Sequence, residues 1–533
     1  MVGVKNSPLI LTLLLTLLLL SIAGEPLRSQ PATPPHVFLR VEVGRSVPGP
    51  VSGRLLIFLK PGSGDQQVDS DPFHPEATWV VAREIENVKP GSSIEVDAGE
   101  AAYPQPFSSL PAGDYEAQAV LDVGHSYNYG GRAPEDWVSS VSSLAHWSPV
   151  TGAEPVLVLD QHPPANPQRT ASREKMMARV RPGVAQKEEF ASNLLSRFWG
   201  RPMSIRAWVI LPPGYDSSPN ERYPAVYWTH GFGGKLEYIL SSGMRIRERM
   251  EQGKMPPMIW VMLDESHPGG THEFADSVNN GPWGAALTGE FLPYIERKYR
   301  MDARRSGRFL NGHSSGGWAT LQLEINYPRI FGGTWSTSPD SSDFHDFTGP
   351  DLYASGANMY RKPDGTPWPL IRQDGKVIGT LEQFARLEAV LGPYGGQFTS
   401  FDWVFSPKGD SGAPKPMFDR QTGAVDPEVV AYWRDHYDLA HIVEANWNTR
   451  GADLKGRIHL IVGTSDTFYL DGAAHKFEAV LNRLGAEPHF SYLPDKSHFD
   501  LYAIGQDQEA LFDRIAAEMY AVARPKSNWK SKH

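Results

Sequence analysis

The sequence has 533 residues, which corresponds to roughly three domains at about 150 residues each. Apolar residues make up 40% and charged residues 21%, close to globular averages, which excludes a wholly disordered, collagen-like or coiled-coil chain. The formal net charge of −10 argues against a protein that binds nucleic acids through a positive surface. The chain contains no cysteine, and this excludes disulfides, thiolate nucleophiles and cysteine-ligated metal centres.

Residues 1–24 have the features of a secretory signal peptide. One cation, Lys5, precedes the apolar run of residues 9–20, and small residues follow it up to Ala23 and Gly24. The run is shorter than the roughly 20 residues that a membrane-spanning helix needs. We therefore expect cleavage after Ala23 or Gly24 in preference to retention as a membrane anchor. This predicts a secreted or periplasmic protein that has no membrane attachment after cleavage.

Residues 36–161 predict an all-β domain. Short runs with strand character, separated by turn residues, cover residues 38–43, 54–59, 78–82, 93–96, 115–123 and 156–159. From Tyr115 to Val123 apolar residues alternate with polar or small ones, as in a strand with one buried face. Many short strands without a convincing helix favour a small β-sandwich. Residues 162–190 begin with a proline-rich stretch and are expected to form a linker.

Residues 191–522 change to an alternation of strands and helices. Apolar runs predict strands at 205–211, 225–229, 258–263, 308–311, 333–336, 459–462 and 489–493. Helical segments between them include 286–298, 317–326 and 473–484. This alternation predicts a doubly wound, mostly parallel sheet with both faces covered. Residues 340–456 interrupt it with an aromatic-rich insertion, which we expect to form a cap over the active site.

The segment 311–317, Asn-Gly-His-Ser-Ser-Gly-Gly, contains the pattern Gly-x-Ser-x-Gly between a predicted strand and a predicted helix. In that context a tight turn exposes the serine hydroxyl, and the flanking glycines let other backbone approach it. Ser314 is therefore the candidate nucleophile, and we expect the neighbouring His313 to point away from it. A glycine-rich turn with a capping serine is the structural alternative.

A second loop, His-Gly-Phe-Gly-Gly at residues 230–234, also follows a predicted strand. A loop of this kind can direct a backbone N–H at a developing oxyanion, with a second N–H supplied by the residue after the nucleophile. We expect Phe232 and Ser315 to provide these donors, with Gly231 or Gly233 as alternatives to Phe232. An ordinary flexible glycine loop remains the alternative interpretation.

A serine nucleophile needs a base and an orienting carboxylate. In folds of this class the chain order is serine, acid, histidine. Asp466 follows the predicted strand 459–462, and His498 follows the last one, so both lie at the sheet edge where ligands bind. Asp471 and Asp495 are the rival acids, but Asp471 suits a helix cap and Asp495 is close to His498 in sequence.

Together, these segments resemble the putative esterase (esterase D-like) family of α/β-hydrolases. The resemblance covers residues of about 190–510 and rests on residues 206–216, 222–227, 230–234 and 312–317. That family includes feruloyl and acetylxylan esterases, S-formylglutathione hydrolases and mycolyltransferases. The resemblance implies an α/β-hydrolase fold and a Ser314–His498–Asp466 triad that needs no metal or organic cofactor.

We therefore expect a secreted serine esterase that acts by two-step acyl transfer on a carbohydrate-linked or phenolic ester, either free or attached to a polysaccharide. An acyltransferase or a serine peptidase would use the same triad. The non-enzymatic alternative is a carbohydrate- or surface-binding protein that has a hydrolase fold without activity. The sequence assigns no function to the N-terminal domain and no oligomeric state.

Overall fold

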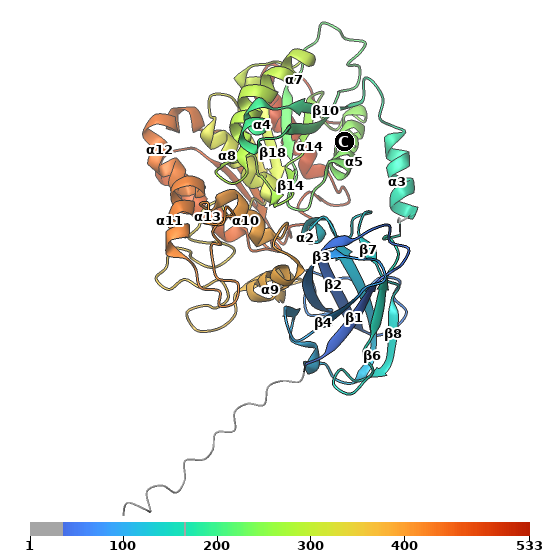
Figure 1. Cartoon of the computed structure of the whole chain (residues 1–533). Helices are drawn as coiled ribbons and strands as arrows, with labels where there is room; N and C mark the ends of the chain where they lie inside the picture. Colours follow the sequence, from blue (N-terminus) through green and yellow to red (C-terminus); the bar gives the residue numbers. More distant parts are fainter. Residues whose placement is uncertain (1–35, 165–166, 533) are drawn as a thin grey trace, which may run out of the picture.

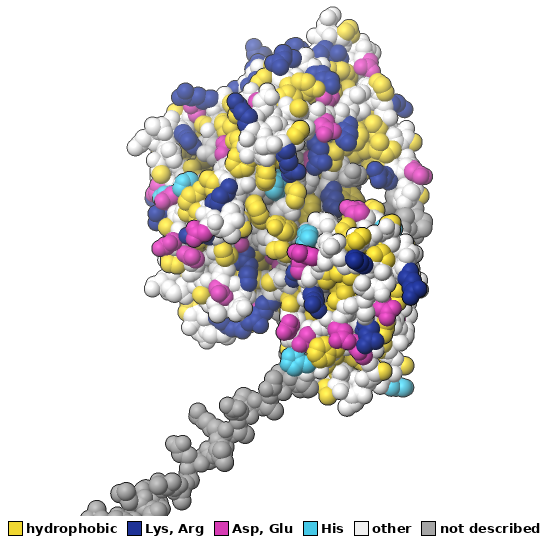
Figure 2. Space-filling model, in the orientation of Figure 1, with side chains coloured by type: hydrophobic (Ala, Val, Ile, Leu, Met, Phe, Trp, Pro, Cys, Tyr) yellow, Lys and Arg dark blue, Asp and Glu magenta, His cyan; other side chains and the backbone are white. Residues whose placement is uncertain are grey.

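The computed structural model describes residues 36–164 and 167–532, which form two bodies packed against each other (Figure 1). The predicted export signal, residues 1–24, lies outside the described residues. Within the described part of the chain, no helix has both the length and the hydrophobicity of a membrane span. Figure 2 shows basic side chains interspersed with acidic ones, so the visible face carries no extended surface of one sign.

The N-terminal body is a β-sandwich, as predicted. One sheet has the order β4–β1–β9, formed by Ser93–Asp97, Phe38–Val43 and Val156–Leu159. The other has the order β5–β3–β2–β6–β7, with β8 also paired to β6, and is formed by Ala102–Tyr103, Trp79–Val88, Val51–Pro61, Gly113–Asp122, Trp137–Val138 and Ser142–Trp147. Alternate side chains such as Leu39, Val41, Leu55 and Ile57 are buried between the sheets, which is the period expected of strands with one core-facing side.

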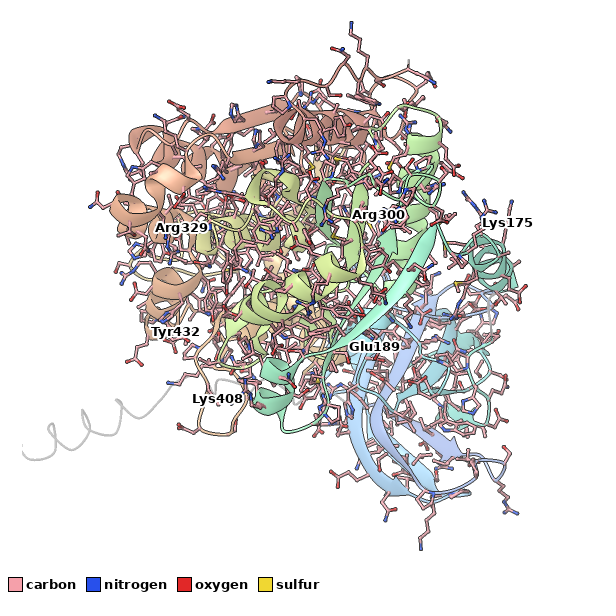
Figure 3. The ribbon with its side chains drawn as sticks, turned by 90° about the horizontal axis from the view of Figure 1, so that it is seen from above. Lys175, Glu189, Arg300, Arg329, Lys408 and Tyr432 are labelled. Atoms are coloured by element: carbon pink, nitrogen blue, oxygen red, sulfur yellow. The ribbon has the colours of Figure 1, made fainter. Side chains whose placement is uncertain are left out.

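The segment 162–190 differs from the expected linker. It contains helix α3, Pro167–Met177, and most of strand β10, Ala185–Ala191, which pairs antiparallel with β11, Ser204–Ile210. The second body therefore begins before residue 191 (Figure 3, where Lys175 marks α3 and Glu189 marks β10). Both elements are rich in polar and charged residues, so neither has the apolar run from which we predicted the other strands.

The second body is built on a sheet of eight strands in the order β10–β11–β13–β12–β18–β19–β22–β23. The strands after β11 are β12 (Ala225–Thr229), β13 (Ile259–Leu263), β18 (Arg308–His313), β19 (Thr334–Thr337), β22 (Ile458–Gly463) and β23 (His489–Leu493). β10, β11 and β13 pair antiparallel, and all pairs from β13 to β23 are parallel. This is the predicted mostly parallel sheet of an α/β-hydrolase.

Helices cover both faces of this sheet, which explains its continuous apolar strands. On one face Val226 and Trp260 pack with α5, Leu236–Glu251, and α14, Ala510–Ala523. On the other face Tyr227 and Val261 pack with α7, Leu292–Lys298. Helices α8, Ser315–Asn326, and α13, Asp471–Arg483, contribute to a third cluster that extends into the insertion.

The insertion of residues 340–456 forms a hairpin and four helices. The hairpin consists of β20, Pro369–Gln373, and β21, Lys376–Thr380. The helices are α9, Leu381–Leu391; α10, Gln397–Phe405; α11, Pro427–Tyr437; and α12, Leu439–Leu454. Most of its aromatic side chains form one buried cluster with α8 and α13, so packing accounts for much of the aromatic content.

Helix α9 joins the two bodies. Leu387 and Leu391 are buried in a cluster with strands of the β-sandwich. Arg54 of β2 donates from Nε to the Val390 carbonyl at 3.0 Å, and Asn128 donates to the Gly392 carbonyl at 2.9 Å. These carbonyls belong to the C-terminal end of α9, where peptide oxygens lack intrahelical partners and favour a cation. The contacts therefore fix the β-sandwich against the insertion.

Candidate active site

Ser314 lies in the turn between β18 and α8, with φ 61° and ψ −128°. Non-glycine residues rarely adopt this conformation, and it persists where the surroundings enforce it. The Ser314 N–H donates to the Thr337 carbonyl at 3.0 Å, which ties the turn to the neighbouring strand β19. A Cβ on Gly312 would collide with the Gly316 carbonyl. The tight strand-to-helix turn thus has the form that presents a nucleophilic hydroxyl.

His498 lies in the loop after β23, and Asp466 lies in the loop after β22. Nδ1 of His498 is 2.9 Å from Oδ2 of Asp466, and both side chains are almost completely buried. Oδ1 of Asp466 accepts the Phe468 N–H at 2.9 Å. Burial opposes ionisation of Asp466, but His498 and this N–H hold the pKa of its carboxyl below the usual value. Asp466 is therefore a charged partner that leaves Nε2 of His498 for chemistry.

The two rival acids make other contacts. Asp471 begins α13 and accepts a hydrogen bond from Arg372 at 2.9 Å. Asp495 lies in the turn after β23 with φ 59°, and its N–H donates to Thr464 at 3.0 Å. Neither carboxyl is hydrogen-bonded to His498 among the described residues, whereas Asp466 is.

The loop 230–234 lies directly against the serine turn. A Cβ on Gly231 would lie 2.9 Å from Cβ of Ser314, so only glycine allows this approach. The Glu265 N–H donates to Nε2 of His230 at 3.0 Å, which leaves the protonated Nδ1 to donate to the Gly231 carbonyl at 2.7 Å. In the described residues, the N–H groups of Phe232 and Ser315 make no hydrogen bond. The loop is thus held in place with both expected donors unpaired.

The ring of His313 packs against that of His498, a contact that we did not predict. Its ring centroid is 4.4 Å from that of His498, and the side chain lines the same cavity as Ser314. Nδ1 of His313 lies 3.2 Å from the Thr337 hydroxyl. Burial, reinforced by the neighbouring His498, lowers the pKa of His313 to about 3. A neutral ring here supports His498 by packing, a role that the strand pattern alone did not indicate.

Ser314 and His498 line one cavity of about 580 Å³. This volume is in the range of small-molecule sites. Its apolar lining comes from the β-sandwich, the loop 230–234, the insertion and the loops after β22 and β23. The residues are Pro72, Phe73, Phe232, Phe347, Leu370, Ile371, Phe384, Phe398, Phe401, Phe468, Leu470, Phe499 and Tyr502. The predicted cap therefore does contribute to the cavity that contains the serine. The contribution of Pro72 and Phe73 was not predicted, because nothing in their local sequence marks a binding residue.

Asp340 is a further carboxyl of the cavity that sequence analysis did not single out. It follows β19 and accepts a hydrogen bond from the Ser315 hydroxyl at 2.6 Å. Burial raises its pKa to about 6, although Ser315 and His498 oppose this. Glu265 and Glu273 are fully buried, and burial together with the charge of Asp340 raises both pKa values well above normal. An acid directly after a parallel strand was the available signal for Asp340.

One group of side chains has the spacing of a cation site. Ligand atoms of Asp343, His345 and Asp438 lie within 4.8 Å of one another. Asp343 already contacts the His345 ring at 2.8 Å, and Asp438 accepts the Tyr353 hydroxyl and the Phe344 N–H. These bonds account for the arrangement, and we assign no ion to it.

Several known proteins are similar to this chain. A sequence profile of the family described as Putative esterase matches residues 199–519, more than half of the chain. The chain belongs to this esterase family. Esterase Rv1288 of Mycobacterium tuberculosis is 31% identical over 140 residues, which cover 26% of this chain and 30% of the relative. An endo-1,4-beta-xylanase/feruloyl esterase of Xylanibacter ruminicola is 28% identical over 134 residues, 23% of this chain and 18% of that protein. The chain thus spans less than a third of these relatives.

Solved structures of esterases are also similar to this chain. A ferulic acid esterase has a TM-score of 0.39 and 16% identity, covering 64% of this chain and 97% of its own. An S-formylglutathione hydrolase from Agrobacterium tumefaciens has a TM-score of 0.37 and 14% identity, covering 65% of this chain and 96% of its own.

Proposed function

We propose that this chain is an exported serine esterase that hydrolyses carboxylic esters with Ser314, His498 and Asp466. The observation that carries the proposal is the hydrogen bond between buried His498 and Asp466 beside a cavity that also contains the strained Ser314. A buried carboxylate on Nδ1 fixes the tautomer in which Nε2 accepts a proton. Membership of an esterase family supports the same chemistry.

The reaction proceeds in two steps. Nε2 of His498 takes the hydroxyl proton as Oγ of Ser314 attacks the ester carbonyl, and Asp466 stabilises the imidazolium. The N–H groups of Phe232 and Ser315 hold the oxyanion, and loss of one such donor costs about 3–4 kcal/mol of barrier. His498 then gives the proton to the departing alcohol. In the second step His498 takes a proton from water as the water oxygen attacks the acyl-enzyme. The C–O bond to Ser314 then breaks, and His498 returns the proton to Oγ of Ser314 as the acid leaves.

For the substrate we propose a carbohydrate-linked or phenolic ester. The cavity is lined largely by phenylalanine and aliphatic side chains, which favours an aromatic or alkyl group in part of the ester. The feruloyl esterase among the relatives, which is similar over 134 residues, supports a phenolic acid as the acyl part. Export is proposed from the apolar run of residues 9–20 followed by small residues.

A fluorophosphonate probe tests this function directly. Such a probe phosphonylates an activated serine, so we expect one label per chain on the peptide that contains Ser314. Asp466→Asn should slow the labelling strongly, because the base would be misoriented. Labelling of another serine, or none under conditions where the folded protein is stable, would refute the proposed nucleophile. A panel of acetyl, feruloyl, glucuronoyl and short fatty acyl esters then identifies the substrate class.

A further inference from the structure

The β-sandwich contributes a side chain to the cavity that contains Ser314. Pro72 and Phe73, from the loop between β2 and β3, line this cavity. The Phe73 ring lies 6.3 Å from that of Phe468 and 5.7 Å from that of Phe499, measured between centroids. Phe73 also packs against the core cluster of the second body. Two bodies that differ in fold therefore share one wall of the site.

The loop that carries Phe73 is held by its own side chains. Asp71 accepts the Phe73 N–H at 2.9 Å. Asp69 accepts the Nε–H of Arg132 at 2.8 Å and the Tyr127 hydroxyl at 2.9 Å. Aspartate commonly stabilises loops through such bonds to nearby backbone. The position of Phe73 is thus fixed by the β-sandwich itself.

This aromatic group lies on the histidine side of the cavity. Ring centroids of Phe468 and Phe499 are 4.9 and 5.4 Å from that of His498, and both rings meet it edge-on. Phe499 is 66% exposed and lies next to Phe73 and Phe468, so the three rings form an apolar surface that a ligand can reach. In ester cleavage the histidine protonates the departing alcohol. The alcohol part of a bound ester therefore lies nearest to these rings.

We propose that Phe73, Phe468 and Phe499 form the subsite for the alcohol part of the ester, so that the N-terminal β-sandwich is part of the active site. This proposal rests on the proposed esterase function. The ligand chemistry that fits is a flat apolar face, which an aryl ring or the C–H face of a sugar ring can supply. Aromatic side chains pack against such faces with defined geometry. Phe73 is then a specificity-determining residue.

The test compares two series of esters with the full-length Phe73→Ala variant. In the first series acetate is constant and the alcohol is methyl, benzyl or a methyl glucoside. In the second, the p-nitrophenyl leaving group is constant and the acyl chain has two, four or eight carbons. We expect the benzyl or glucoside kcat/KM to fall about fivefold relative to methyl acetate. If kcat/KM falls for the benzyl ester, the subsite binds an aryl alcohol, and if it falls for the glucoside ester, the subsite binds a sugar alcohol. The relative rates across the acyl series should stay unchanged.

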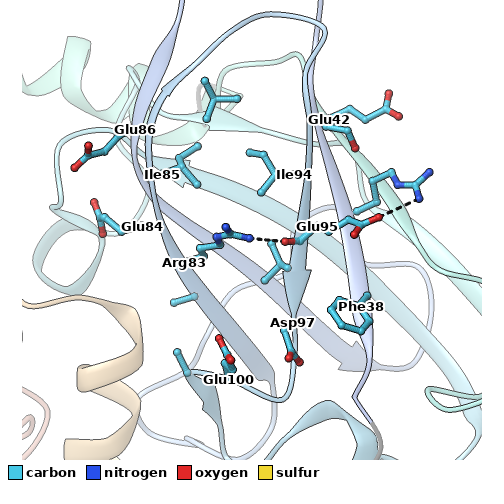
Figure 4. Close-up of a pocket in the computed structure, with 16 residues that line it drawn as sticks. Phe38, Glu42, Arg83, Glu84, Ile85, Glu86, Ile94, Glu95, Asp97 and Glu100 are labelled. Carbon is cyan, nitrogen blue, oxygen red and sulfur yellow. Dashed lines mark hydrogen bonds and ion pairs between the residues drawn. The ribbon is translucent and has the colours of Figure 1, made fainter.

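Two further variants separate this role from a structural one. Phe38→Ala is the matched control, because Phe38 is an exposed phenylalanine of the same domain in a groove formed with β3 and β4, outside the catalytic cavity (Figure 4). It should leave both series unchanged, and Phe73→Tyr should retain the wild-type preference. Equal losses on all alcohols, or a change that follows the acyl chain, would overturn the proposal. Fluorophosphonate titration counts active sites, so an unlabelled wild type would refute the esterase function instead.

Discussion

Nδ1 of His498 and Oδ2 of Asp466 are 2.9 Å apart in a pair that is almost fully shielded from water. The second oxygen of Asp466 is occupied by the Phe468 N–H, so the carboxylate cannot turn without losing a bond. This hydrogen bond connects the loops after β22 and β23, which are parallel neighbours in the sheet. It fixes the orientation of the imidazole and leaves Nε2 available to the cavity.

Replacement of this carboxylate should lower kcat strongly while the fold persists. We expect Asp466→Asn to lower kcat by about a thousandfold to ten-thousandfold, because the amide favours the wrong tautomer of His498. Asp471→Asn is the matched control, since Asp471 follows the same strand but pairs with Arg372. It should keep kcat within about twofold of wild type. Steady-state hydrolysis of an activated ester measures kcat of both variants. If Asp471→Asn lowers kcat more than Asp466→Asn does, Asp466 is not the acid that orients His498.

Tyr129 of the β-sandwich contacts the loop that is expected to hold the oxyanion. Its hydroxyl donates to the Gly234 carbonyl, and its ring lies 5.7 Å from that of Phe232. We expect Tyr129→Phe to lower kcat about fivefold with little change in KM, since one hydrogen bond is worth about 1 kcal/mol. Tyr115→Phe removes a comparable bond, to the Pro111 carbonyl at 2.7 Å, away from the cavity. If both variants behave alike, Tyr129 has no special effect on the loop.

The approach of the loop 230–234 to the serine requires a glycine. A Cβ at position 231 would be 2.9 Å from Cβ of Ser314, a distance that forces the loop or the turn to move. We predict that Gly231→Ala lowers kcat/KM by at least about a hundredfold, because the oxyanion donors must be placed accurately. Gly289→Ala, where a Cβ meets open space, serves as the control. Wild-type activity in the Gly231 variant would show that the loop has no catalytic part.

Asp340 should make stability depend on pH. Burial raises its pKa to about 6 in the folded protein, whereas an unfolded aspartate titrates near about 3.9. The folded state therefore binds the proton more tightly, and this contribution is complete below about pH 4 and is lost as the pH rises through about 6. Relative to Asp340→Asn, the wild type should lose up to about 3 kcal/mol between about pH 4 and pH 8. Urea unfolding at each pH gives the free energy of unfolding of both proteins. If the stability of the wild type relative to Asp340→Asn stays constant or rises with pH, the prediction is wrong.

The catalytic body was predictable from sequence because its elements carry strong local patterns. Ser314, Asp466 and His498 each follow a short apolar run, now β18, β22 and β23. Chain order and strand position together therefore predicted that all three lie at one edge of the sheet. Strand β10 was missed because an edge strand paired on one side keeps polar residues such as Lys187 and Glu189.

Contacts between the two bodies were not predictable in the same way. Phe73 and Tyr129 lie in a loop and a one-turn helix, α2 (Tyr127–Gly130), whose local sequences fit ordinary surface turns. Their partners, Phe468 and Phe232, are far away in sequence. Such contacts depend on how two folded units meet, and no periodic pattern within either unit specifies that.

The most direct test of the account is the turnover number of Ser314→Ala on a small activated ester. Ser314 is only partly buried and lines the cavity, so the variant should unfold at about the same urea concentration as wild type. We predict that its kcat falls by at least about ten-thousandfold, leaving only what binding and the oxyanion donors supply. A folded Ser314→Ala protein that hydrolyses the ester at the wild-type rate would contradict the account.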